Sequence, residues 1–270
     1  MTDKVPPVVA EKLTSGVFNA ENPPKDWCDV SLLLPHEGVR YELYAMRDAV
    51  AAMKVDTPDS EGWRLANFAT WYVDVFYNAI HAHHDAEEEI YFPWINTRAK
   101  LPEKLATDHV GLMKLMDEIQ GACKKMIEKK GKGCSEEVKI VQEKTGSLVE
   151  TMVEHLKEEE TMVPPALREH FKEEEEKELI QKILQKEGLA MCRSFLPSIM
   201  VAMNDWAKPE FKKEFLSTMP GPILHLYTKY YEPDYFTYVV PMRDAPKLEK
   251  QPALTKVGCC GIPFCFPCIL

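Results

Sequence analysis

Two short segments of the chain combine histidine, glutamate and proline at the same spacing. The first is HHDAEEEIYFP at residues 83–93, and the second is HLKEEETMVPP at residues 155–165. Their shared positions pair His83 with His155, Glu87 with Glu159, and Pro93 with Pro165. Positions i and i+4 of an α-helix lie on one face about 6 Å apart, so each copy can direct an imidazole and a carboxylate at one point. A helix presents two ligands to one metal site in this way, and each helix is expected to end near its proline.

A further histidine precedes each copy at nearly the same distance. His36 lies 47 residues before His83, and His109 lies 46 residues before His155. This length fits an antiparallel hairpin of two long helices, with one ligand near the start of the first helix and two near the end of the second. Two such hairpins make a four-helix bundle in which the ligands converge at one level. The predicted metal ligands are His36, His83, Glu87, His109, His155 and Glu159.

The elements that must position these residues are long amphipathic helices. Apolar residues recur at spacings of three and four, and the candidate ligands lie on the same stripes. We expect a first helix that starts at about His36, so that Pro35 lies in its first turn, where proline is tolerated. Further helices are expected over residues 61–96, from residues 101–102 onward, and over residues 135–163. Burying an unpaired histidine or an ionised glutamate costs roughly several kcal/mol unless the charge is compensated. A metal would compensate it, and the pocket around it is expected to be lined by Leu112, Met113, Met116 and Met152.

The histidine doublet at the start of the first copy leaves a choice between two ligand pairs. His84 and Glu88 also stand four residues apart. The repeat favours His83, because the second copy has Leu156 opposite His84. His84 and His81 are then expected to support the ligands or to lie at the surface, and the metal should survive replacement of His84. The carboxylates expected to be solvated or to orient imidazoles are Glu88, Glu158 and Glu160.

The composition argues against several other classes of protein. The chain has 270 residues, 45% of them apolar, and a formal net charge of -10. This charge argues against nucleic-acid binding, which needs a basic surface. The sequence has no signal-peptide core and no run of about 18 apolar residues, so we expect a cytoplasmic protein. It also has no nucleophile beside a base and no phosphate loop, which favours a metal-binding or sensor protein over an enzyme.

The predicted fold is all-α, an up-down four-helix bundle with a further C-terminal helical region packed on it. We divide the chain into an N-terminal arm (1–28), a metal-binding bundle (29–168), a helical extension (169–247) and a Cys-rich apolar tail (248–270). Within the extension, helices are expected over residues 174–187, 190–205, 209–216 and 224–231.

The end of the chain, residues 257–270, has no charged side chain and contains Cys259, Cys260, Cys265 and Cys268. It is too short to span a bilayer. Pro267 occupies the position four from the end, where prenylation requires cysteine. Three interpretations stay open: reversible acylation that attaches the chain to a membrane, a soft-metal site of four thiols, and packing against the rest of the protein.

The pattern of ligands resembles the hemerythrin-like proteins with the HHE cation-binding domain. The resemblance covers residues 29–167 and is carried by His36, Asp108-His109 and the two repeated segments. It implies an up-down four-helix bundle around a non-haem di-iron centre. The four histidines would be terminal ligands, and Glu87 and Glu159 would bridge the metals. Members of this family carry oxygen, sense oxygen, iron or redox state, or repair damaged iron centres.

One position departs from the oxygen carriers of this family. They have a fifth histidine one turn after the third-helix ligand, where this chain has Met113. Four imidazoles and two bridging carboxylates would give each metal two nitrogens and two oxygens, and both metals would keep an open position. We expect two iron ions rather than manganese or zinc. Imidazole and carboxylate ligands suit iron or manganese, whereas structural zinc prefers closed tetrahedral sites richer in sulfur.

The leading functional hypothesis is a di-iron protein that reacts with or senses oxygen, peroxide, nitric oxide or iron. Two open irons suit this role better than reversible oxygen storage, which is the first alternative. The second alternative is a membrane-tethered helical interaction protein with a structural metal or none, supported by the cysteine-rich tail and the acidic region after residue 169. The expected partner is a small diatomic or peroxide ligand in the first two cases, and a membrane with an unidentified protein in the third.

Overall fold

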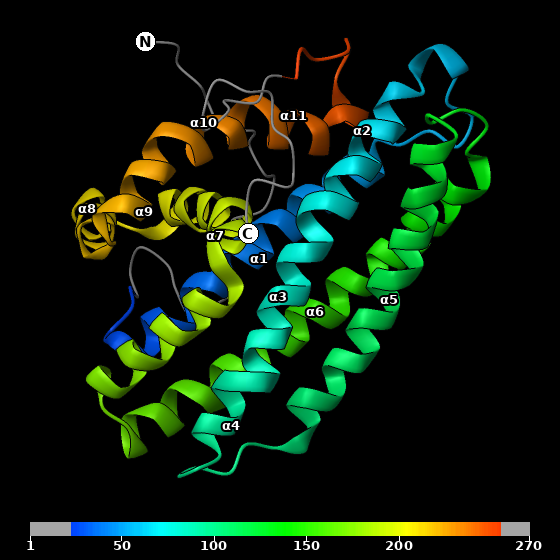
Figure 1. Cartoon of the computed structure of the whole chain (residues 1–270). Helices are drawn as coiled ribbons and strands as arrows, with labels where there is room; N and C mark the ends of the chain where they lie inside the picture. The colour runs from blue at the N-terminus through cyan, green and yellow to red at the C-terminus, as the bar shows by residue number, and fades with distance from the viewer. Residues whose placement is uncertain (1–22, 255–270) are drawn as a thin grey trace.

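The computed structural model describes residues 23–254, except for some side chains between residues 187 and 206. Within this range every regular element is a helix, and Figure 1 shows the long helices side by side with the C-terminal helices gathered on one side. The predicted all-α fold, a four-helix bundle with a further helical region packed on it, is confirmed. The N-terminal arm up to residue 22 and the tail from residue 255, with its four cysteines, lie outside the described residues.

The first hairpin consists of α1 (Trp27–Ala51) and a long helical run in which two short π-helical segments interrupt the α-helix. After the short 3-10 turn η1 (Asp59–Glu61), this run comprises α2 (Trp63–Trp71), the π-helical η2 (Tyr72–Phe76), α3 (Tyr77–Ala86), the π-helical η3 (Glu87–Tyr91) and α4 (Phe92–Ile95). π-helical turns inside α-helices are rare, and those that occur often lie at functional sites. The second of them starts at a candidate ligand, Glu87.

The second hairpin consists of α5 (Glu103–Glu128) and α6 (Ser135–His170). α5 packs against α6 and against α2, and α6 packs against α1, so the two hairpins close into a bundle. At one end the turn before α6 lies close to the start of α2. Gly131, with a φ of 71°, approaches Gly62 so closely that a Cβ would lie 1.9 Å from the Gly62 carbonyl oxygen. This turn therefore requires glycine.

Two predicted helix ends are wrong, and both errors come from prolines. α1 begins at Trp27 instead of after His36, because the Asp26 carboxylate accepts hydrogen bonds from the backbone N–H groups of Cys28 and Asp29 and caps the helix there. Pro35 therefore lies inside the helix. α6 continues through Pro164 and Pro165 to His170 instead of ending at residue 163. The apolar stripe continues in that segment, since Val163 and Leu167 are both fully buried.

The chain beyond the bundle is helical, as predicted, and begins with α7 (Glu173–Trp206). A backbone kink at Gly188, with a φ of 67°, separates two helical halves, and the break was expected after residue 187. The remaining elements are α8 (Pro209–Thr218), α9 (Gly221–Leu226), η4 (Tyr227–Tyr231), α10 (Glu232–Asp234), η5 (Tyr235–Val239), α11 (Val240–Arg243) and η6 (Ala245–Lys247). Across residues 23–254, none of the helices combines the length and the apolar character that crossing a bilayer requires.

α7 packs against both α1 and α3 and so forms part of the wall of the bundle. Its contact with α1 is close at Gly38, where a Cβ would lie 2.9 Å from the Cγ1 of Ile199. Gly38 is two residues after the candidate ligand His36, on the same helix. The extension therefore packs directly behind the level of the candidate site.

Two apolar clusters fill the bundle, and the candidate ligands lie between them. The large cluster includes Leu43, Phe76, Met116 and Leu148, and the second cluster includes Leu33, Phe92, Leu105 and Val163. On each of the four helical runs the candidate ligands stand between members of the two clusters. The ligands therefore form a buried polar level with apolar packing on both sides.

A second buried polar group joins the extension to α1. Arg243 is fully buried and donates to Glu42 at 2.9 Å. The hydroxyls of Tyr235 and Ser198 also donate to the Glu42 carboxylate, at 2.5 and 2.8 Å. Asp244 accepts from the Arg243 guanidinium at 3.1 Å. This network connects α1 with α7, η5 and α11.

Replacing Arg243 by alanine should destabilise the protein by about 3–5 kcal/mol, because it leaves the Glu42 carboxylate buried without its cation. Urea denaturation followed by circular dichroism measures this loss. The matched control is Lys139→Ala, which removes the partner of Glu136 in an exposed ion pair and should cost less than about 1 kcal/mol. Similar losses in the two variants would contradict the role of Arg243.

The contribution of Glu176, near the start of α7, to the stability of the protein should fall as pH rises from about 4.5 to 7. Burial raises the pKa of this carboxyl from 4.5 to about 7, so between these values the folded state binds more protons than the unfolded state. The stabilisation is complete below the unfolded pKa and is lost as pH rises through the folded pKa.

Glu176→Gln cannot ionise, so at pH 8 it should be more stable than the parent by on the order of 1–3 kcal/mol, with a smaller difference at pH 4.5. Thermal or urea denaturation across this pH range measures the difference. Glu174→Gln, on the exposed face of the same helix, serves as the control. Parallel pH profiles for the parent and Glu176→Gln would rule the explanation out.

Candidate metal centre

The six residues predicted as metal ligands lie at one level of the bundle and are buried. Their exposed fractions are 0% for His36, 6% for His83, 3% for Glu87, 1% for His109, 2% for His155 and 0% for Glu159. α1, α5 and α6 each contribute one histidine, α3 contributes His83, and the two glutamates come from η3 and α6. The four helical runs therefore bring the six side chains together.

The first half of the site is formed by His36 and His83, whose rings meet edge to face with centroids 5.4 Å apart. The Nε2 atoms of His36 and His83 lie 3.7 and 3.4 Å from Oε1 of Glu87. His36 Nε2 also lies 3.4 Å from Oε2 of Glu159. Two nitrogens and two carboxylate oxygens therefore face one point.

The second half of the site is formed by His109 and His155. Their Nε2 atoms are 2.9 Å apart, close to the roughly 3 Å between adjacent ligands that each lie about 2.1 Å from one metal ion. Oε2 of Glu87 lies 3.6 Å from His109 Nε2. Oε1 of Glu159 lies 3.6 Å from His109 Nε2 and 3.2 Å from His155 Nε2. This half mirrors the first in its donor atoms.

Each of the two carboxylates thus directs one oxygen to each histidine pair. Both oxygens of Glu87, both oxygens of Glu159 and the Nε2 atoms of His36 and His83 are buried, and none has a hydrogen-bond partner among the described residues. Leaving a buried polar atom unpaired costs about 1–3 kcal/mol, and more when the atom is charged. A pair of divalent cations, one for each half, would satisfy all of these atoms, so the residues present fit a dinuclear centre.

Outer carboxylates fix the orientation of two of the imidazoles. Nδ1 of His36 lies 3.0 Å from Oε1 of Glu160, which also accepts from Arg40 at 2.7 Å. Nδ1 of His109 lies 2.8 Å from Oε1 of Glu88. When each Nδ1 donates its proton outward, the Nε2 lone pair points at the carboxylates inside, as a metal ligand requires. The third candidate, Glu158, binds Lys104 at the surface.

The close approach of histidines and glutamates shifts the pKa values of His36 and Glu159. Burial opposes the charged form of His36, but its interactions with Glu160 and Glu87 outweigh burial and raise its pKa to about 9. Burial likewise opposes ionisation of Glu159, but His109 and His155 outweigh it and lower the pKa of that carboxyl. Positive charge is therefore favoured at the centre of the site.

The two other histidines near the first copy have different surroundings. His81 is exposed and pairs with Asp85 at 2.8 Å, as expected for a surface group. His84, which the sequence left outside the ligand set, is 3% exposed and has no hydrogen-bond partner for either ring nitrogen among the described residues. Burial, followed by the charges of His109, His83 and His155, lowers the pKa of His84 well below its ordinary value.

The inward position of both histidines of the doublet was not predicted. Consecutive helical residues point about 100° apart, and the argument from a single stripe places only one of them inside. Here His83 faces His36 and Phe195 of α7, whereas His84 faces His109 and His155. The doublet itself was the signal in the sequence, because a helix with neighbours on two sides buries both residues.

The apolar residues expected around the site lie in the large cluster. Leu112, Met116 and Met152 are fully buried there, and Met113 is partly buried and packs against them. α7 adds a residue that the sequence did not identify, since the Phe195 ring lies 6.0 Å from the His83 ring. These side chains separate the polar level from water.

Comparison with known proteins supports this assignment over part of the chain. Residues 35–167 match the family model described as Hemerythrin HHE cation binding domain. No curated protein and no solved structure was found to match the chain. The matched range includes all six candidate ligands and ends near the end of α6, so α7 and the later helices lie outside it.

Replacing His155 or Glu87 by alanine should remove at least one of two bound metal ions per chain, because each change deletes a donor that no neighbouring residue replaces. Metal content after loading and desalting, measured by plasma mass spectrometry, gives the result. His81→Ala, three residues from the doublet's second histidine but exposed, is the control and should keep the full metal content. Unchanged metal content in both site variants would contradict the assignment.

Proposed function

Residues 35–167 belong to the Hemerythrin HHE cation binding domain family, and from this premise we propose that the chain binds two iron ions and uses them to react with or sense a small molecule. The candidates are oxygen, peroxide and nitric oxide, or the iron supply itself. His36 and His83 would hold one ion, and His109 and His155 the other. Glu87 and Glu159 would each bridge the two ions.

The observation that carries this proposal is the arrangement of the two carboxylates. Each sends one oxygen toward each histidine pair, and all four oxygens are buried without hydrogen-bond partners among the described residues. A single cation would leave one oxygen of each carboxylate unpaired. Two cations would pair all four, and a structure with none would carry the full cost of burial.

The donor chemistry favours iron. Imidazole nitrogens and carboxylate oxygens suit iron and manganese, whereas structural zinc sites are closed, tetrahedral and richer in sulfur. Bound iron would supply one-electron redox chemistry and coordination positions for small ligands. The protein's own contribution is to orient the ligands and to exclude water. Glu160 and Glu88 orient His36 and His109, and the two apolar clusters enclose the level of the site.

Metal analysis with absorption spectroscopy tests this function. The protein is purified without oxygen, loaded with iron(II), desalted and then exposed to air. We expect two irons per chain and a near-ultraviolet absorption band that appears on oxidation. Zinc-loaded protein is the control, because zinc has no redox chemistry and should give no such band.

Fewer than one iron per chain after both aerobic and anaerobic preparation would contradict the proposal. Iron binding without any spectral change on addition of air, peroxide or nitric oxide would contradict its redox part. That second result would favour a structural metal.

A further inference from the structure

The histidine doublet brings a further imidazole, that of His84, to the buried level of the site beside His109 and His155. We propose that His84 binds the cation held by His109 and His155, so that five imidazoles divide three and two between the two cations. This inference rests on the proposed function and specifies how its two metal positions differ. It revises the expectation from the sequence that the metal survives replacement of His84.

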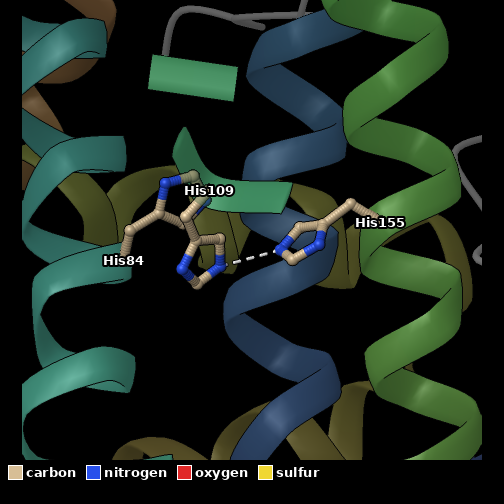
Figure 2. Close-up of side chains that lie close together, drawn as sticks. All are labelled: His84, His109 and His155. Atoms are coloured by element: carbon tan, nitrogen blue, oxygen red, sulfur yellow. Dashed lines mark hydrogen bonds between the residues drawn. The ribbon is translucent and has the colours of Figure 1, made fainter. Parts of the chain in front are cut away.

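The geometry of three side chains supports this assignment. His84, His109 and His155 each offer a ring nitrogen, and these three atoms lie within 4.8 Å of one another. Figure 2 shows the three rings gathered between α3 and α6, with α1 behind them. His84 stacks on His109 with ring centroids 4.1 Å apart, and its ring lies edge to face with that of His155 at 5.9 Å.

A purely structural role explains the position of His84 poorly. A neutral imidazole has one N–H donor and one acceptor nitrogen. Neither ring nitrogen of His84 has a hydrogen-bond partner among the described residues, although the side chain is buried. An apolar side chain would fill the same space without that penalty. A bound cation would give one of these nitrogens a partner.

α5 offers only one imidazole, that of His109, to this cation, and α3 packs beside it. α5 carries Met113 one turn after His109, and Met113 packs against the large apolar cluster. α3 packs against α5, and His84 projects from α3 onto the His109 ring. The third imidazole for this cation therefore comes from the neighbouring helix instead of from the next turn of α5.

The proposed ligation makes the two metal positions unequal. His84, His109, His155, one oxygen of Glu87 and one of Glu159 give one cation five protein donors. His36, His83 and the other two oxygens give the second cation four. Small ligands should therefore bind to the cation at His36 and His83, which lies on the side covered by Phe195 of α7.

The test replaces His84 by leucine, which fills the space but cannot bind a metal. Iron(II) affinity is measured anaerobically, and azide is then titrated into the air-oxidised, iron-saturated protein. We expect the affinity for one of the two irons to fall at least about tenfold, since even groups that only orient a ligand change metal affinity by about 10–100-fold. The number of azide ions bound per chain should rise from one to two. His81→Leu is the exposed control and should match the parent in both measurements.

A measurement on the unaltered protein does not depend on the folding of any variant. In cobalt(II)-loaded protein, each metal-bound imidazole that keeps its ring N–H gives a strongly shifted, solvent-exchangeable proton signal. We expect five such signals, and His84 accounts for the fifth. Four signals would overturn the inference, as would a His84→Leu protein that binds two irons and azide like the parent. If the parent itself binds no iron, the proposed function fails first, so the two failures are distinguishable.

Discussion

The fold depends on one constraint, which is that a layer of ionisable side chains must be accommodated in the middle of an apolar bundle. His36, Glu87, His109 and Glu159 are at most 3% exposed, and apolar clusters lie on both sides of them. Hydrophobic packing cannot satisfy these atoms, and each unpaired one reduces the stability that the bundle gains elsewhere. The proposed cations would convert this level from the weakest part of the core into a cross-link among four helical runs. Folding and metal binding would then be coupled, as in other sites where ligands from distant parts of a chain meet.

Much of this arrangement could be predicted from sequence, because it follows from periodicity. The nearly equal spacing of His36 to His83 and of His109 to His155 predicted two hairpins, and the structure brings those side chains to one level. Helix ends were less predictable. Proline usually marks an end, but Pro35, Pro164 and Pro165 lie inside helices here because a capping aspartate or a continuing apolar stripe outweighs the loss of a backbone hydrogen bond. His84 was misplaced for a different reason, since a stripe drawn on one helix cannot show that two neighbouring helices approach it from different sides.

The extension after α6 is a structural part of the protein and not an appended module. Its attachment to α1 uses a buried arginine, Arg243, with Glu42 and two hydroxyl groups. Such polar groups are costly unless all are paired, so they favour one docking geometry over others. Close packing of Ile199 on Gly38 adds a steric constraint on the same helix. Long-range contacts of this kind leave no periodic signal in the sequence, and the sequence predicted only that the extension packs on the bundle.

The contact between Phe195 and His83 also bears on where this protein can be divided. The family match ends at residue 167, yet one side of the His83 ring is covered by α7. An excised fragment with the boundaries of the family domain would keep every candidate ligand and lose one of the surfaces that enclose them. A fragment that keeps this side of the centre covered therefore has to extend beyond the domain and include Phe195, which follows the kink at Gly188 in α7. Relatives that share the domain but carry a different segment after it would present the same ligands to a different solvent environment.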